Sequence, residues 1–440
     1  MSDYLFTLWD GGGAVPPVLS VAAALVGRGH DVRVLADPVL RDEVSAAGAE
    51  HISWTTAPHR TVRTRESDPI RDFEARTPMG AMARARDHMF MGPADRFARD
   101  TRAELERRRP DAFATEMLLL GTQVAAEAAA LPRAVLCTTV LPLPAPGRPA
   151  FGPGFQPGDS LPARLRDSAL NRMGQRLWDK GLPALNRARA EQGLEPLAHA
   201  FDQFGRTDRL LVLTSERFDY PIDPLPPGVR YVGPRLDDPA WCEQWTPPAG
   251  DAPLVLVGLS SSDQDHTGLL QRIADALGRL PVRGLITTGP AIEPSELRAP
   301  ANVTVVQSAP HSEVLRQAAA VVTHAGHGTV IKALAHGVPL VTIPLGRDQP
   351  DNAARVVHSG TGLRLRPGAS EARIAAAVRR LLDEPGFRAA AGRMADAIQA
   401  ELGEDHAAAE LEALAESRPR ARREPAGRRQ PLANSGLVSE

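Results

Sequence analysis

The stretch VVTHAGHGTVIKALAHGVPLVTIPLGRDQPDNAARV, residues 321–356, carries the clearest fold signal in this sequence. Its opening apolar run ends at His324, and a helix-like segment begins near Thr329 after a glycine-rich turn. The N–H groups at such a helix start are unpaired, and the helix dipole favours an anion such as a diphosphate. We therefore predict a strand–turn–helix unit with an anion site. Gly326 and Gly328 bracket His327 in this turn, so no Cβ stands over the helix start at either position.

This turn lacks the lysine of a Walker A loop and the GxGxxG spacing, which disfavours ATP hydrolysis and dinucleotide binding. A Gly-His-Gly turn can also form a simple turn that binds no ligand. The residues that follow it are therefore needed to choose between the two interpretations. The next apolar run ends in PLGRDQPDN, which places Asp348 and Gln349 one βα unit further on. A carboxylate beside an amide can bind the vicinal hydroxyls of a sugar. Asp348 also suits a helix cap before Pro350.

Short apolar runs alternate with helix-like segments in both halves of the chain, which indicates βαβ units and an α/β fold with parallel sheets. We expect a first Rossmann-like domain at 1–220, a proline-rich linker at 221–250 and a second Rossmann-like domain at 251–385. Helices at 386–416 are expected to pack back on the first domain, before a disordered tail at 417–440.

Composition narrows the functional classes. The net charge of −2 gives no reason to expect a nucleic-acid partner. The two cysteines, Cys137 and Cys242, are far apart, which disfavours a disulfide framework or a zinc site and suits a reducing compartment. We read no signal peptide and no transmembrane run, so we expect a cytoplasmic protein without stable membrane association, as a monomer or homodimer.

The segment 321–356 resembles the donor-binding signature of the GT-B glycosyltransferases, in particular the bacterial natural-product branch related to the UDP-glycosyltransferases. The resemblance rests on His-x-Gly-x-Gly-Thr, Ala-Leu-x-x-Gly-Val-Pro and Asp-Gln, and it extends along the whole chain. It implies two Rossmann-like domains facing each other across a cleft. It also implies that His324 binds the pyrophosphate and that Ser261 and Ser262 line the phosphates. By the same resemblance Asp348 and Gln349 hold the sugar, and the pyrophosphate is cradled by Gly326, His327, Gly328 and Thr329.

Two positions depart from that pattern. The family usually stacks a Trp on the base in a W-x-P-Q stretch, where this chain has SAPH, residues 308–311. It usually grips the ribose with a Glu, where this chain has Lys332. Ala309 and Lys332 are therefore the expected neighbours of the nucleoside, and the choice between dTDP and UDP stays open.

A second glycine-rich turn, WDGGGAVPP at residues 9–17, follows the first apolar run. Gly11, Gly12 and Gly13 remove side chains from the start of a helix, and we expect them to make room for a planar acceptor. In the family this loop carries a His that deprotonates the acceptor, and the alignment puts that His at Gly12, so the usual base is missing.

The acidic partner of that His corresponds to Glu116, and an extra carboxylate, Asp10, precedes the gap. Either carboxylate can be the base if burial raises its pKa, or an acidic acceptor can react with little help. A structural role for Asp10, capping the glycine turn, is equally open.

We therefore expect an inverting, metal-independent glycosyltransferase. It would move a sugar from a dTDP- or UDP-sugar to a hydrophobic, aromatic natural-product acceptor, with no cofactor beyond this co-substrate. No Asp-x-Asp metal signature stands in a suitable loop, and a helix terminus can stabilise the leaving diphosphate. A non-catalytic sugar-nucleotide-binding helper and a GT-B-fold epimerase are the alternatives. The insertions at 55–109 and 141–165 favour an acceptor pocket over the epimerase.

Overall fold

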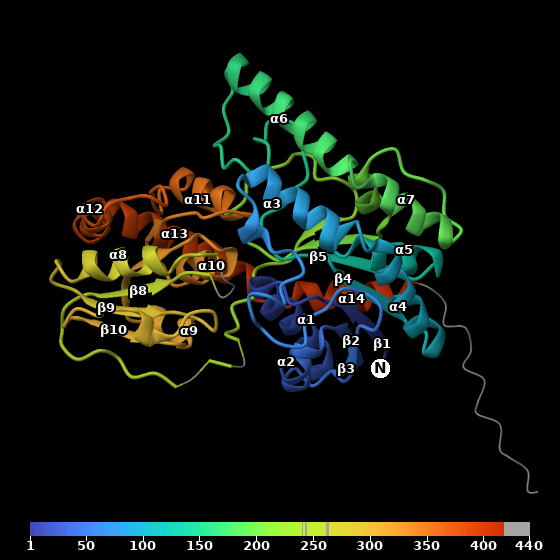
Figure 1. The fold of residues 1–440 in the computed structure, drawn as a ribbon, viewed down its shortest axis with the longest axis horizontal. Coiled ribbons are helices and arrows are strands. Elements are labelled where there is room, and N and C mark those ends of the chain that lie inside the picture. The colour runs from blue at the N-terminus through green and yellow to red at the C-terminus, as the bar shows by residue number, and fades with distance from the viewer. Residues whose placement is uncertain (240, 243, 261–263, 418–440) are drawn as a thin grey trace, which may run out of the picture.

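Two α/β domains lie side by side in the computed structural model, which describes residues 1–239, 241–242, 244–260 and 264–417 (Figure 1). Within those residues, one sheet has the order β3-β2-β1-β4-β5-β6-β7 and the other has the order β10-β9-β8-β11-β12-β13. All the paired strands are parallel. The predicted fold class, two Rossmann-like domains with parallel sheets, is confirmed.

The first domain is built on a sheet whose central strands are buried on both faces, as a parallel sheet requires. Its strands are β1 (Asp3–Thr7), β2 (Asp31–Ala36), β3 (Glu50–Ser53), β4 (Ala112–Glu116), β5 (Arg133–Cys137), β6 (Arg209–Val212) and β7 (Val229–Tyr231). Its helices are α1 (Val15–Gly27), α2 (Arg41–Ala46), α3 (Pro78–Ala85), α4 (Ala94–Arg107), α5 (Leu120–Ala128), α6 (Leu161–Asp179) and α7 (Leu182–Glu191).

The second domain repeats the pattern around the fully buried strand β8. Its strands are β8 (Leu254–Gly258), β9 (Arg283–Thr287), β10 (Val303–Val306), β11 (Ala318–Thr323), β12 (Leu340–Thr342) and β13 (Gly362–Arg364). Its helices are α8 (Thr267–Leu277), α9 (His311–Leu315), α10 (His327–Ala335), α11 (Gln349–His358), α12 (Glu371–Asp383) and α13 (Pro385–Glu401), and the chain then continues into α14 (His406–Glu416).

The domain boundaries differ from the expected ones in two places. The expected linker contributes β7 to the first sheet, because Val229 pairs with Leu210 of β6 and is buried there. Helix α13 packs on the second domain, where Ile398 shares a core with the α10 side chains. Only α14 returns to the first domain, where Leu411 is buried (Figure 1). All but the first residue of the expected disordered tail lie outside the described residues.

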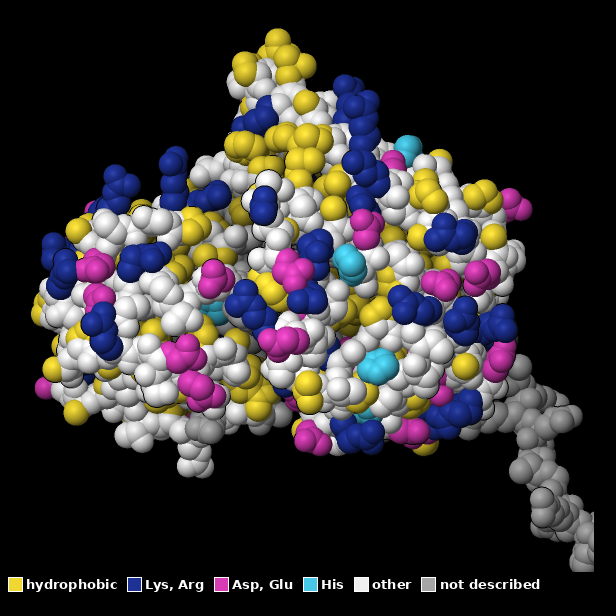
Figure 2. All heavy atoms as spheres, in the orientation of Figure 1, with side chains coloured by type: hydrophobic (Ala, Val, Ile, Leu, Met, Phe, Trp, Pro, Cys, Tyr) yellow, Lys and Arg dark blue, Asp and Glu magenta, His cyan; other side chains and the backbone are white. Residues whose placement is uncertain are grey.

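Two long segments of the first domain stand beside the boundary with the second domain. The segment between β3 and β4 carries α3 and α4, and the segment between β5 and β6 carries α6, which projects from the body of the molecule (Figure 1). Figure 2 shows hydrophobic side chains gathered on α6, where Leu161, Leu165 and Met173 are exposed. Among the described helices, none is both long enough and apolar enough to cross a membrane.

Candidate functional site

A cavity of about 1560 Å³ lies between the two domains. Its wall on the first domain includes the loops that follow β1 and β4, and its wall on the second domain includes the turns that follow β11 and β12. Ligands of open α/β sheets bind at the carboxyl ends of the strands. Both glycine-rich turns that the sequence singled out therefore meet in one cavity.

The turn after β11 is built around His324. A Cβ at position 326 would lie 2.6 Å from Nε2 of His324, so only a glycine lets the imidazole pack over the turn. Gly326 caps α10, whose first residue is His327. Nothing would lie within 4 Å of a Cβ on Gly328, so the helix start opens into free space beside Thr329, which also lines the cavity.

The two histidines of this turn are neutral near pH 7. Burial lowers the pKa of His324 to about 3 and that of His327 to about 4. Nε2 of His327 lies 2.8 Å from Oγ1 of Thr214, at the end of β6 in the other domain. The two imidazoles therefore bring no positive charge to the predicted diphosphate site, which lies at the N-terminus of α10 and within reach of the charge of Arg347. The ring of His327 joins the two domains.

The predicted sugar-binding pair stands at the start of α11 and lines the cavity. Asp348 accepts a hydrogen bond of 2.7 Å from the hydroxyl of Thr139 in the first domain. The Gln349 carbonyl accepts from the backbone N–H of Gly346 at 3.0 Å, and its amide donates to Gln264 at 3.1 Å. Asp348 therefore joins the two domains, and Gln349 holds the loop that precedes α11. Contact of either side chain with a sugar stays a prediction.

Lys332 and Ala309, the expected neighbours of the nucleoside, both line the cavity. Nζ of Lys332 lies 2.6 Å from a carboxylate oxygen of Asp238, a residue that follows β7 and also lines the cavity. Sequence reasoning missed Asp238, because no local spacing links it to Lys332. The two predicted phosphate-lining serines, Ser261 and Ser262, lie outside the described residues.

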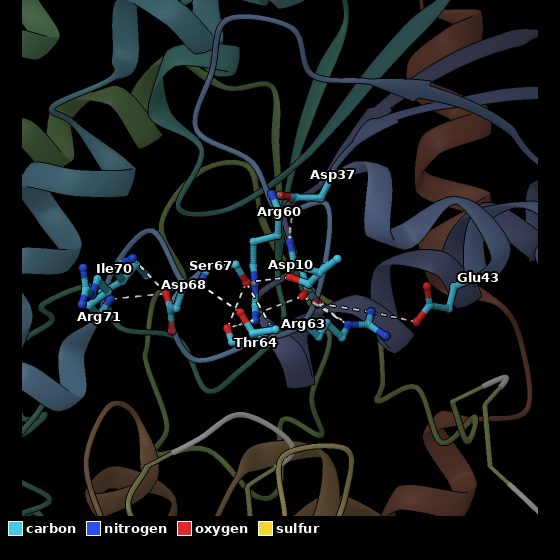
Figure 3. A network of polar contacts seen from close by, with 11 residues as sticks. Asp10, Asp37, Glu43, Arg60, Arg63, Thr64, Ser67, Asp68, Ile70 and Arg71 are labelled. Atoms are coloured by element: carbon cyan, nitrogen blue, oxygen red, sulfur yellow. Dashed lines mark hydrogen bonds and ion pairs between the residues drawn. The ribbon is translucent and has the colours of Figure 1, made fainter.

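Asp10 is the centre of the polar network in Figure 3. Its carboxylate accepts hydrogen bonds from Arg60 at 3.1 Å and from Arg63 at 3.2 Å, and its backbone N–H donates to Asp37 at 2.8 Å. Arg63 also donates to Glu43 of α2 at 2.8 Å. Asp10 therefore ties the segment after β3 to the first glycine turn, and its oxygens are already engaged by two guanidinium groups.

Glu116 ends β4 and is 2% exposed. Its Oε2 accepts hydrogen bonds from the indole N–H of Trp9 at 3.0 Å and from the backbone N–H of Leu118 at 2.9 Å. Burial raises the pKa of this carboxyl to about 7, against its usual 4.5. Of the two predicted candidates, Glu116 is thus the one whose surroundings suit a general base near neutral pH.

Sequence reasoning also missed Trp9, although it begins the quoted turn. The register Thr7↔Thr115 between β1 and β4 brings the end of one strand beside the end of the other, which explains how Trp9 reaches Glu116.

The three glycines of this turn have separate tasks. A Cβ at position 11 would lie 2.8 Å from Cζ2 of Trp9, so Gly11 makes room for the indole. Gly12 has a φ of +66°, which favours glycine. Nothing would lie within 4 Å of a Cβ on Gly13, which faces open space.

A row of aromatic rings lines the cavity beside Glu116. The centroid of Trp9 lies 5.8 Å from Phe90, which lies 6.2 Å from Trp178, and Trp178 lies 5.7 Å from Phe201. Aromatic walls of this kind bind flat apolar ligands through their faces and edges.

Among the described residues, an ion pair spans the cavity between the domains. Nε of Arg347, next to Asp348, lies 2.8 Å from a carboxylate oxygen of Asp72 in the segment after β3. That segment is also held by Asp10, so it contacts the first glycine turn and the loop between β12 and α11.

Comparisons with known proteins agree with this geometry. Residues 271–414 match the family model of the erythromycin biosynthesis protein CIII-like C-terminal domain. The chain is 33% identical over 397 residues to 4'-demethylrebeccamycin synthase of Lentzea aerocolonigenes, covering 88% of this chain and 93% of that protein. It is 27% identical over 417 residues to TDP-daunosamine transferase DnrS of Streptomyces peucetius, covering 86% and 88%.

The crystal structure of the glycotransferase of kitacinnamycin has the same fold, with a TM-score of 0.74 at 24% identity over 94% of this chain and 98% of that one. Two parallel-sheet domains, a cavity between them and these relatives lead to one conclusion: the chain belongs to the GT-B glycosyltransferases of natural-product biosynthesis.

Proposed function

We propose that this enzyme is an inverting, metal-independent glycosyltransferase that moves a sugar from a dTDP- or UDP-sugar to a hydrophobic, aromatic acceptor. The proposal rests mainly on one observation, that a single cavity contains both a helix N-terminus suited to a diphosphate and an aromatic wall suited to an acceptor. The N-terminus of α10 forms one wall, and the aromatic row that begins beside Glu116 forms another.

The donor half rests on the second domain. The open N-terminus of α10 suits the diphosphate, and the neutral His324 can donate a hydrogen bond to it. The name of the relative from Streptomyces peucetius specifies a TDP-linked sugar, which supports a nucleoside-diphosphate sugar here.

The transfer itself is a single displacement. The acceptor nucleophile attacks the anomeric carbon while Glu116 takes its proton, and the bond from that carbon to the diphosphate breaks with inversion. The N-terminus of α10 stabilises the negative charge that develops on the diphosphate, and this is the task that a metal ion would otherwise perform. The nucleotide sugar is the co-substrate, and no further cofactor is required.

The test is incubation with dTDP- and UDP-sugars, with and without a panel of phenolic and heteroaromatic acceptors, followed by mass spectrometry. We expect a glycosylated acceptor whose anomeric configuration, measured by NMR, is opposite to that of the donor, in a reaction that a chelator leaves unchanged. A changed sugar without acceptor would indicate an epimerase. Donor binding without any product would favour a helper of another transferase.

A further inference from the structure

We propose that Trp9 is a positioning residue of the transfer reaction, which holds Glu116 through its indole N–H so that the carboxylate can take the acceptor's proton. The inference rests on the proposed role of Glu116 as the base.

Donors from the ends of two neighbouring strands meet at the carboxylate of Glu116. The indole N–H of Trp9 and the backbone N–H of Leu118 both donate to Oε2 of Glu116, at 3.0 and 2.9 Å. These two donors come from different strand ends, because Trp9 follows β1 and Leu118 follows β4. The backbone of Met117 also hydrogen-bonds to Glu116, so the carboxylate is held by the residues that follow β4 as well as by the indole.

Trp9 cannot take the proton itself. An indole N–H is a donor only, whereas a carboxylate accepts. The hydrogen bond from Trp9 stabilises the charged form of Glu116 and opposes the effect of burial on its pKa, as does the bond from Leu118. Among titratable neighbours, Cys137 of β5 is affected by the charge of Glu116, and burial keeps its thiol neutral with a pKa of about 12.

The indole is itself held in place. Its ring meets Phe90 edge to face, with centroids 5.8 Å apart and an interplanar angle of 73°. Position 11 also has no room for a Cβ, which would lie 2.8 Å from Cζ2 of the indole. The sequence Trp9-Asp10-Gly11 is therefore one unit, in which the glycine lets the ring lie against its own turn.

The ring has a second task, because Trp9 also lines the cavity as the first member of the aromatic row. An acceptor packed along that row would be adjacent to Glu116. One side chain thus orients the base and forms part of the surface that places the nucleophile beside it.

The test is Trp9→Phe, which keeps a ring and removes the N–H. The matched control is Trp54→Phe, since Trp54 belongs to the same apolar cluster and its N–H donates to the carbonyl of Leu8 at 3.1 Å, away from the cavity lining. The measurement is the pH profile of kcat/KM, with donor binding by calorimetry as the check on folding.

We expect Trp9→Phe to lower kcat/KM roughly tenfold at pH 7 and to move the lower midpoint of the profile upward by roughly one pH unit. Trp54→Phe should leave that midpoint in place. Gly11→Ala, which crowds the indole, should shift the midpoint in the same direction as Trp9→Phe. An unmoved midpoint in both Trp9→Phe and Gly11→Ala would overturn the inference.

The variant Glu116→Gln shows whether a negative result contradicts only the role of Trp9 or also the role of Glu116 as the base. If Glu116→Gln abolishes turnover while Trp9→Phe leaves the midpoint unmoved, the inference about Trp9 alone is wrong. If Glu116→Gln retains wild-type turnover, the proposed base is wrong, and the positioning role of Trp9 is overturned with it.

Discussion

The substitution Glu116→Gln should have opposite effects on activity and on stability. Glutamine keeps the shape and the carbonyl that accepts from Trp9 and Leu118, but it cannot take a proton. Turnover should fall by roughly 10²–10⁴, the contribution typical of general-base catalysis. In the wild type, kcat/KM should rise with pH through about 7, where the buried carboxyl ionises.

The stability effect follows from the same pKa. Because folding raises the pKa of Glu116 from 4.5 to about 7, the folded state binds more protons than the unfolded state between these values. Its stability contribution is therefore present below pH 4.5 and is lost as the pH rises through 7. At 1.36 kcal/mol per pH unit, the loss above pH 8 is about 3 kcal/mol.

A neutral glutamine does not suffer this loss. We expect Glu116→Gln to melt at a higher temperature than the wild type at pH 8.5 and to approach it at pH 5.5, by calorimetry or circular dichroism. A difference in Tm that does not change with pH would refute the assignment of a raised pKa. Higher stability at pH 8.5 with unchanged turnover would instead refute the role of Glu116 as the base.

Further substitutions test three other contacts of the cavity. His324→Ala should weaken binding of the nucleoside diphosphate by about 1–3 kcal/mol in calorimetry, and an unchanged affinity would contradict the donor site. Asp10→Asn should free the segment after β3, so that limited proteolysis there becomes faster while the pH midpoint of turnover stays, and a moved midpoint would favour Asp10 as the base instead. Asp72→Asn should raise the donor KM about two- to fivefold, as expected for a partly exposed ion pair, with Arg347→Gln giving no further increase in the double variant. Additive effects of those two changes would show that the pair does not act as a unit.

Sequence patterns were informative where the interactions are local. The glycine turn around His324 and the helix that begins at His327 are contiguous in the chain, so spacing alone predicts them. The roles of Gly326, which accommodates the ring of His324, and of Gly12, with its positive φ, depend on the same kind of short-range geometry. Buried apolar runs likewise predicted the parallel sheets, since each such strand needs cover on both faces.

Only the tertiary structure decided which side chains meet. Trp9 and Glu116 are 107 residues apart and become neighbours because β1 and β4 pair in the sheet with Thr7 opposite Thr115. Lys332 and Asp238 are 94 residues apart, and no repeating pattern connects them. The sequence by itself determined the two Rossmann-like halves and the glycine turn before α10, because hydrophobic periodicity and turn chemistry act over a few residues. Sheet order, strand register and the packing of one domain on the other determined the partner of each carboxylate, because these contacts exist only once the chain has folded.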